Sequence, residues 1–175
     1  MSMGNEAMII RQATAEDLDV LRAAGLEAMN WTGESRFTFE QFMSLPELSH
    51  YLEGWPRPGD FGVVAETAEG TPVGAAWCRI FAVDDAGYGF VAPDIPELTI
   101  GVLAGHRGTG VGTALMERLI GQGSSRGLRA ISLSVEDGNR ARLLYERLGF
   151  RKVDRNGGSD TLLLEFRTSL LTAGE

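Results

Sequence analysis

The stretch RGTGVGT at residues 107–113 sets three alternate glycines between a segment patterned as a strand, PELTIGVLAGH, and one patterned as a helix, ALMERLI. The first amides of a helix lack partners within the helix and carry a partial positive charge. Glycine allows the backbone to approach a ligand closely and to adopt a positive φ angle. The turn therefore favours a cradle for a phosphate or diphosphate, and the alternative is a tight turn that packs against a neighbouring segment.

Two familiar phosphate-binding loops fit this stretch poorly. A Walker loop ends in Gly-Lys-Ser or Gly-Lys-Thr, and residues 107–113 contain no lysine. The dinucleotide fingerprint places glycines at its first, third and sixth positions, but the sixth position counted from Gly108 is Thr113. A mononucleotide-binding α/β protein is therefore a disfavoured alternative.

Helix and strand patterns alternate along the chain on both sides of the glycine turn. Thr14 is placed to cap a first helix, and Asp17 occupies the capping-box position. A second helical stretch is interrupted near Pro46, and the Gly- and Pro-rich residues 84–96 predict an irregular loop. The element order β-α-α-β-β-β-α-β-α-β-β predicts an α/β (α+β) domain, with a mixed, mostly antiparallel sheet of about seven strands flanked by about four helices.

Length, charge and cysteine content limit the classes of function. The 175 residues favour one domain at residues 7–168, between a flexible N-terminus at 1–6 and a tail at 169–175. The net charge of −8 argues against nucleic-acid binding, and no apolar run is long enough to span a membrane. Cys78 is the only cysteine, which suits a reducing compartment, so we expect a cytoplasmic protein.

A second motif follows the glycine turn, in the stretch VEDGNRARLLYERLGFRKV. Together with RGTGVG, it makes residues 95–153 resemble the GNAT superfamily of acyl-CoA-dependent N-acetyltransferases. The family's diphosphate loop reads Arg-x-x-Gly-x-Gly, and its later helix carries the pattern N…A…LYerlGF. The chain departs from the family at Ala104, where many members have proline, and at His106, a place often held by an aromatic or polar residue. Neither change removes an amide donor from the cradle.

The resemblance implies a GNAT-like fold and an acetyltransferase that uses acetyl-CoA as co-substrate and no metal. The acceptor would be a small-molecule amine, or a peptide or protein amine, that attacks the thioester directly in a ternary complex. Neither a nucleic acid nor a membrane is an expected partner, and a homodimer is compatible with the family. The residues that the resemblance assigns to coenzyme A are Ile100, Val102, Arg107, Gly108, Thr109, Gly110, Val111, Gly112, Thr113, Asn139 and Tyr145.

Two side chains are candidates for catalysis. Glu97 begins the strand that leads into the cradle, and the resemblance makes it the general base, acting directly or through water. A strand from Glu97 to Arg107 reaches up to about 33 Å when fully extended, so it can follow the long cofactor. The alternative for Glu97 is an exposed carboxylate that titrates normally, and Asp94 is the substitute base. The resemblance aligns Tyr145 with the tyrosine that protonates the departing thiolate, and its alternative role is core packing.

Several other residues have expected roles around these two. The resemblance implies a strand bulge at Gly101, beside which the pantetheine arm pairs with the backbone, and the alternative is a glycine that merely makes room. Asn139 is expected to cap a helix and, by resemblance, to bond the same arm. His50 and His106 are expected to be surface or packing residues. Cys78 is expected to be a buried small hydrophobe.

The acceptor is expected near residues 30–40, the loop 84–96 and the hairpin NGGS. The candidate aromatic walls are Trp31, Phe37, Phe39, Tyr88 and Phe90, and the candidate carboxylates that attract a cation are Glu34, Asp84 and Asp85. Ordinary loop composition is the alternative explanation for both sets. For the whole protein, the alternative to an enzyme is a catalytically silent CoA-binding sensor or interaction protein.

Overall fold

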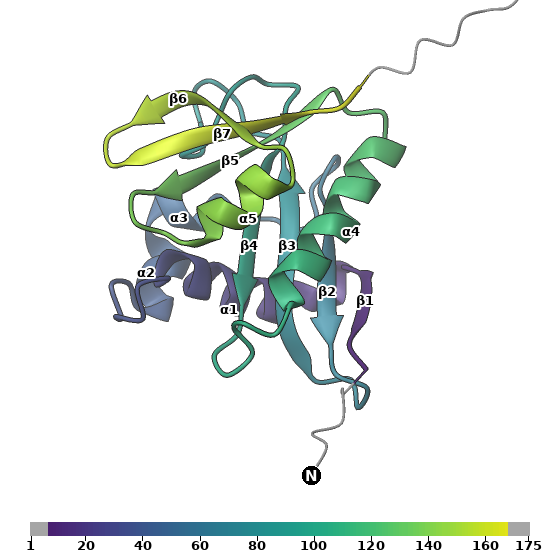
Figure 1. Ribbon diagram of the computed structural model, residues 1–175. Coiled ribbons are helices and arrows are strands. Elements are labelled where there is room, and N and C mark those ends of the chain that lie inside the picture. Colours follow the sequence, from purple (N-terminus) through teal and green to yellow (C-terminus); the bar gives the residue numbers. More distant parts are fainter. Residues whose placement is uncertain (1–6, 168–175) are drawn as a thin grey trace, which may run out of the picture.

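A seven-stranded sheet forms the centre of the protein in the computed structural model, which describes residues 7–167 (Figure 1). The strands lie in the order β1-β2-β3-β4-β5-β7-β6, and their pairs are antiparallel except for β4 with β5. Their bounds are β1 Ile9–Gln12, β2 Phe61–Glu66, β3 Pro72–Arg79, β4 Glu97–Val102, β5 Ala130–Glu136, β6 Arg151–Asn156 and β7 Ser159–Glu165. The predicted N-terminus at 1–6 and tail at 169–175 lie outside the described residues.

Helices cover both faces of the sheet (Figure 1). The helices α4 and α5 lie on one face, and α1, α2 and α3 lie on the other. Their bounds are α1 Leu18–Met29, α2 Phe39–Ser44, α3 Pro46–Ser49, α4 Val111–Ser125 and α5 Ala141–Arg147. The capping box of Thr14 and Asp17 is formed, and Pro46 begins α3 directly after the end of α2. The mixed, mostly antiparallel sheet with flanking helices confirms the predicted fold class.

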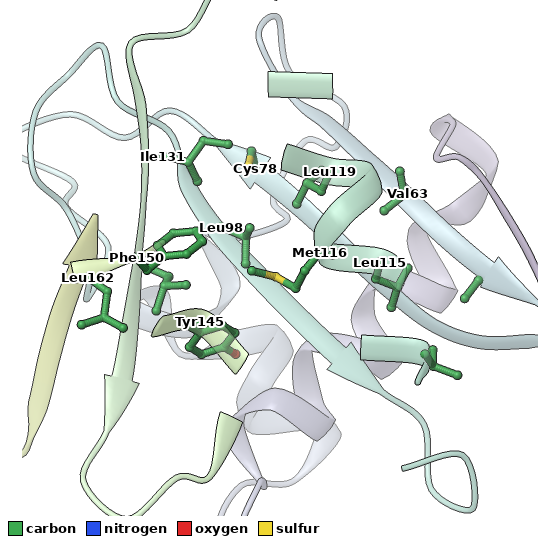
Figure 2. Packing of buried hydrophobic residues seen from close by; sticks show 14 of the residues in the cluster. Val63, Cys78, Leu98, Leu115, Met116, Leu119, Ile131, Tyr145, Phe150 and Leu162 are labelled. Atoms are coloured by element: carbon green, nitrogen blue, oxygen red, sulfur yellow. The ribbon is translucent and has the colours of Figure 1, made fainter. Parts of the chain in front are cut away.

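The core beneath α4 shows why the patterned segments fold as they do (Figure 2). Leu115, Met116 and Leu119 form the buried stripe of this helix. They pack in one cluster with Ile131 and its alternate neighbours along β5, which is the alternation that the sequence predicts. A second buried cluster fills the opposite face, under α1, α2 and α3.

The sheet opens between the parallel strands β4 and β5. Among the described residues, Glu97 and Ser132 are the one pair that joins these strands in register. The amide of Ser132 donates to the carbonyl of Pro96 at 3.0 Å, just before that point. Beyond Glu97 the two strands are no longer paired, which leaves a gap in the middle of the sheet.

The alternation of side chains along β4 divides them between the two faces of the sheet. Leu98, Ile100 and Val102 belong with the cluster under α4 and α5. Because successive side chains of a strand point to opposite faces, Glu97 and Gly101 point toward the face covered by α1 and α3.

The predicted bulge at Gly101 is wrong. Strand β4 pairs with β3 in continuous register from Glu97 to Val102. A Cβ atom at Gly101 would overlap the carbonyl group of Ala24 in α1, so glycine is required because the helix crosses the strand here. The alternative prediction, a glycine that makes room, is the one that the structure supports.

Candidate active site

A cavity of about 610 Å³ lies at the gap between β4 and β5. Its lining comes from both faces of the sheet, since Tyr145 belongs to the cluster under α4 and α5 and Tyr51 belongs to the cluster under α1, α2 and α3. Glu97 lines the same cavity and marks the point where the pairing of β4 with β5 ends. Two reactants can therefore approach Glu97 from opposite faces of the sheet.

The glycine turn borders this cavity and has the geometry of an anion cradle. Gly108 and Gly110 adopt φ angles of 73° and 87°, which other residues rarely adopt. A Cβ atom at either position would meet nothing within 4 Å in the described part of the chain, so packing against a neighbour does not explain these glycines. Gly110 is the N-cap of α4, and no side chain between residues 7 and 167 caps this helix. Its first amides are therefore available to a ligand.

Most of the residues assigned to coenzyme A by the sequence line the cavity. They are Ile100, Val102, Arg107, Gly108, Gly110, Gly112, Thr113, Asn139 and Tyr145. Val111 is instead buried in the core beneath α4. The hydroxyl of Thr109 donates to the carbonyl of His106, so it is engaged within the turn. These two residues have only their backbone amides to offer a ligand.

The backbone of β4 presents amides to the gap between the strands. The amide of Leu103, just after β4, donates to the carbonyl of Val73 at 2.8 Å, on the side of β3. Successive amides of an extended strand point to opposite edges, so those of Ile100 and Val102 point toward the gap that β5 has left. A pantetheine arm at the predicted position would require this orientation.

Arg107 lies beside the cradle and already has an anionic partner. Its guanidinium contacts a carboxylate oxygen of Glu27, at the end of α1, at 2.6 Å. The arginine side chain is 45% exposed, so it is free to turn toward a ligand. A bound diphosphate would compete with Glu27 for this cation.

Glu97 is a buried carboxyl group, unlike the exposed carboxylate of the alternative prediction. It is only 3% exposed. Burial raises its pKa from 4.5 to about 7, and this rise is partly offset by the hydroxyl of Tyr51 and by the amide of Gly89, which donates to the carboxylate. A group with a pKa near neutrality can accept a proton and release it again under physiological conditions.

The loop between β3 and β4 closes over Glu97 and causes this burial. A Cβ atom at Gly87 or Gly89 would lie 2.8 or 2.9 Å from a carboxylate oxygen of Glu97, so the loop can approach this closely only with glycine. The amide of Tyr88 donates to the hydroxyl of Tyr51 at 2.8 Å and so fixes the loop to the segment after α3. The loop thereby removes most of the carboxyl group from solvent, which disfavours its charged form.

Tyr51 is a residue of the site that sequence reasoning missed. It contacts Glu97 and lines the cavity, and its own pKa is raised by burial and by the nearby carboxylate. All three tyrosines of the chain, Tyr51, Tyr88 and Tyr145, line this one cavity. Nothing in their spacing marks the cluster, because the fold brings together segments that lie far apart in the sequence.

Tyr145 reaches the cavity from the face opposite to Tyr51. Its ring packs edge-on against Phe150, with the ring centroids 6.2 Å apart, and lies within the core that Figure 2 shows. Burial raises its pKa to about 12, so the hydroxyl keeps its proton at neutral pH and is able to donate it. Asn139 accepts a hydrogen bond from the amide of Ala141, the first residue of α5, at 3.0 Å, which leaves its side-chain amide to serve as a donor. The N-cap of α5 is Arg140, so the predicted cap is displaced by one residue.

The predicted aromatic walls are only partly present around the cavity. Trp31, Phe37 and Tyr88 line it. Phe39 and Glu34 border a separate hollow, and Phe90 packs with the cluster under α1, α2 and α3.

The other predicted acidic residues do not line the cavity. Asp84 is exposed, and Asp85 contacts Nδ1 of the buried His50 at 2.8 Å. Asp94, the substitute base, is exposed and forms an ion pair with Arg129, which lowers the pKa of the aspartate. Of the carboxyl groups that the sequence offers as a base, Glu97 is therefore the one that lines the cavity.

Cys78 is fully buried in β3, and this burial raises the pKa of its thiol, so it is a packing residue as expected. Across residues 7–167, no three His, Cys, Asp or Glu side chains are grouped as a metal site. In the same range, no helix has both the length and the apolar character needed to cross a membrane.

Comparison with known proteins relates this geometry to a family. The model of the acetyltransferase (GNAT) family matches residues 26–150. The chain is also similar to the ribosomal protein bS18-alanine N-acetyltransferase of Haemophilus influenzae, with 40% identity over 55 residues, which are 31% of this chain and 38% of that protein. The chain spans between 31% and 38% of the length of the curated relatives it matches.

Solved structures share the fold over most of the chain. A ribosomal-protein-alanine N-acetyltransferase from Brucella melitensis is 26% identical, with a TM-score of 0.64 over 90% of this chain and 99% of that one. The PaiA N-acetyltransferase of Thermoplasma acidophilum, solved in complex with coenzyme A, is 18% identical, with a TM-score of 0.64 over 91% of this chain and 99% of that one. At this identity the second likeness shows the fold alone.

Proposed function

The chain belongs to the acetyltransferase (GNAT) family, and on that premise we propose that it transfers the acetyl group of acetyl-CoA to a primary amine by direct attack in a ternary complex. One observation carries the proposal. A single cavity passes through the sheet at the gap between β4 and β5, with an anion cradle at one end and the buried carboxyl group of Glu97 at the gap.

The residues around the cradle fit coenzyme A. The uncapped amides at the start of α4 suit its diphosphate, because the glycines before them leave open space and a positive helix end. Arg107 adds a cation that can leave Glu27 for a phosphate. The amides of Ile100 and Val102 suit the amide groups of the pantetheine arm, and the bound donor supplies an activated acyl thioester.

Glu97 and Tyr145 supply the proton transfers that the reaction needs. Glu97 takes a proton from the ammonium form of the acceptor, and the nitrogen of the neutral amine then forms a bond to the thioester carbonyl carbon. The carbon–sulfur bond of this intermediate breaks, and the hydroxyl of Tyr145 gives its proton to the leaving thiolate. The proton balance closes when the nitrogen gives up its second proton, which replaces the one lost by Tyr145, and Glu97 releases its own proton to solvent. Tyr51 and the amide of Gly89 hold the carboxyl group in place.

Release of free CoA from acetyl-CoA, measured with a panel of primary amines, tests this proposal. We expect release that depends on both the protein and an amine. Tight CoA binding with no release for any amine would instead support the catalytically silent sensor. The Glu97→Gln variant is the matched control, since it should bind CoA as the wild type does and release it far more slowly.

Membership of the family is compatible with either kind of acceptor, a small-molecule amine or a peptide or protein amine. The Haemophilus relative is named for an alanine of a ribosomal protein, and the chain matches only 38% of that relative. The cytoplasmic location, the homodimer and the domain limits of 7–168 stay predictions from the sequence.

A further inference from the structure

The acceptor side of the cavity is aromatic and apolar. We call it the acceptor chamber and define it by lining residues that lie toward α1, α2 and α3: Met29, Trp31, Phe37, Leu48, Tyr51 and Tyr88. The rings of Tyr51 and Tyr88 stack with their centroids 6.5 Å apart and their planes 22° from parallel. Glu97 contacts Tyr51 and lines the same cavity, so an amine nitrogen at the carboxyl group lies close to these rings.

The charged side chains that line the cavity are already paired with each other. Arg36 holds Glu136 through two contacts of 3.0 and 3.1 Å, and Arg107 holds Glu27. Among the cavity-lining residues of the described chain, Glu97 is the one carboxyl group without a cationic partner. That group is needed for the proton of the reacting amine.

We propose that the acceptor is a primary amine carried on an aromatic group, with no second charge. This inference rests on the proposed function and narrows its substrate class. The stacked rings offer a flat apolar surface to an aryl group, and their faces attract the ammonium form as it enters. None of the six residues that define the acceptor chamber carries a charge, so a second ammonium group would be buried there without a partner, which is costly. The carboxylate of an amino acid would likewise find no unpaired cation, because Arg36 is held by Glu136.

A substrate panel at saturating acetyl-CoA tests the proposal. It compares 2-phenylethylamine with spermidine, with β-alanine and with a short peptide that begins with alanine, and kcat/KM is measured by CoA release. We expect 2-phenylethylamine to exceed each of the others by about tenfold or more. A preference for spermidine, for β-alanine or for the peptide would overturn the proposal.

Variants of Tyr88 make the test specific to the chamber. Its side chain is 43% exposed, and it fixes the loop through its backbone amide, so Tyr88→Ala removes the ring and keeps that hydrogen bond. We expect Tyr88→Ala to lower the ratio of kcat/KM for 2-phenylethylamine to that for ethylamine by about tenfold. Tyr88→Phe should keep the ratio, and so should Leu143→Ala, which changes an exposed residue of α5 outside the cavity. A ratio unchanged in Tyr88→Ala would contradict the proposal.

A binding measurement separates this proposal from the proposed activity. The affinities of 2-phenylethylamine and of spermidine are measured by calorimetric titration of each amine into the protein saturated with CoA. Tighter binding of 2-phenylethylamine without turnover would support the chamber and refute the acetyltransferase activity. Tighter binding of spermidine would refute the chamber, whatever the activity.

Discussion

Replacement of Glu97 by glutamine isolates the chemistry of one buried carboxyl group. Glutamine has nearly the same shape and can still accept the hydrogen bond that the amide of Gly89 donates. The cradle at the start of α4 is unaffected, so CoA affinity is retained. Proton transfer by a positioned side chain contributes typically about 10² to 10⁴ in rate, and we expect kcat to fall by a factor in this range at neutral pH.

The pKa of about 7 makes a quantitative prediction for the pH dependence of the rate. With this pKa, about 1% of Glu97 is ionised at pH 5 and about 90% at pH 8, whereas an ordinary glutamate would already be about 75% ionised at pH 5. The contribution of Glu97 should therefore rise about 90-fold between pH 5 and pH 8. The small neutral fraction of the acceptor amine also grows over this range, and it does so equally for wild type and variant.

The assay is kcat/KM of the same amine for both proteins from pH 5 to pH 8, because this parameter reports the pKa of the base before the amine binds. The ratio of wild type to Glu97→Gln removes the ionisation of the acceptor and leaves that of Glu97. We expect this ratio to rise through a pKa near 7. A ratio that does not change with pH would show that Glu97 is not the base, and a rise complete by pH 5 would refute the argument from burial.

The same carboxyl group affects stability, which can be measured without any substrate. Burial raises the pKa of Glu97 above its ordinary value of 4.5, so between pH 4.5 and pH 7 the folded state binds more protons than the unfolded state. The free energy of unfolding of the wild type should therefore fall as pH rises through this window, by up to about 3 kcal/mol. Urea unfolding at pH 5 and pH 8 should show this fall in the wild type and not in Glu97→Gln. An equal fall in both proteins would contradict the assignment.

Three further substitutions, one of them paired with a control glycine substitution, test other parts of the site and fold. Tyr145→Phe keeps the packed ring and removes the proton donor, so steady-state kinetics should show kcat about 10²-fold lower with unchanged thermal stability, and an unchanged kcat would exclude it as the acid. In Gly110→Ala the turn can leave the strained φ of 87° in the free protein but must return to it to present the cradle amides, at a cost of about 1–2 kcal/mol, so calorimetry should show about tenfold weaker CoA binding; undiminished affinity would argue against the cradle. Gly101→Ala should overlap Ala24 and lower the free energy of unfolding by about 3 kcal/mol in urea, whereas Gly121→Ala, in open space on α4, should raise it by about 0.5–1 kcal/mol; equal effects would refute the close crossing of α1.

The parts of the molecule that could be predicted from the sequence are those set by local rules. The alternation around Ile131, the capping box of Thr14 and Asp17, and the glycines before α4 each follow from residues within a few positions of one another. The glycine turn and the later LLYERLGF stretch follow each other in the order typical of the GNAT family. That order predicts that the cradle and Tyr145 belong to one coenzyme-binding site. The structure brings both to the same cavity.

The parts that could not be predicted depend on segments that meet only in the fold. A glycine inside a strand fits both a bulge and a close crossing, and only the position of α1 over Gly101 distinguishes them. Tyr51 lies far from Glu97 in sequence. It comes to the site because the amide of Tyr88, in the loop over Glu97, donates a hydrogen bond to the hydroxyl of Tyr51. The sequence suggests Asp85 as a carboxylate that attracts a cation, but in the fold Asp85 contacts the buried His50.

A crystal structure of the protein with coenzyme A tests most directly the claim that donor and acceptor meet through the gap in the sheet. The account predicts the diphosphate on the amides of residues 110–113, the pantetheine arm between β4 and β5 along Ile100 and Val102, and the sulfur beside the hydroxyl of Tyr145. The coenzyme bound elsewhere, with the gap between β4 and β5 closed or filled by protein side chains, would contradict it.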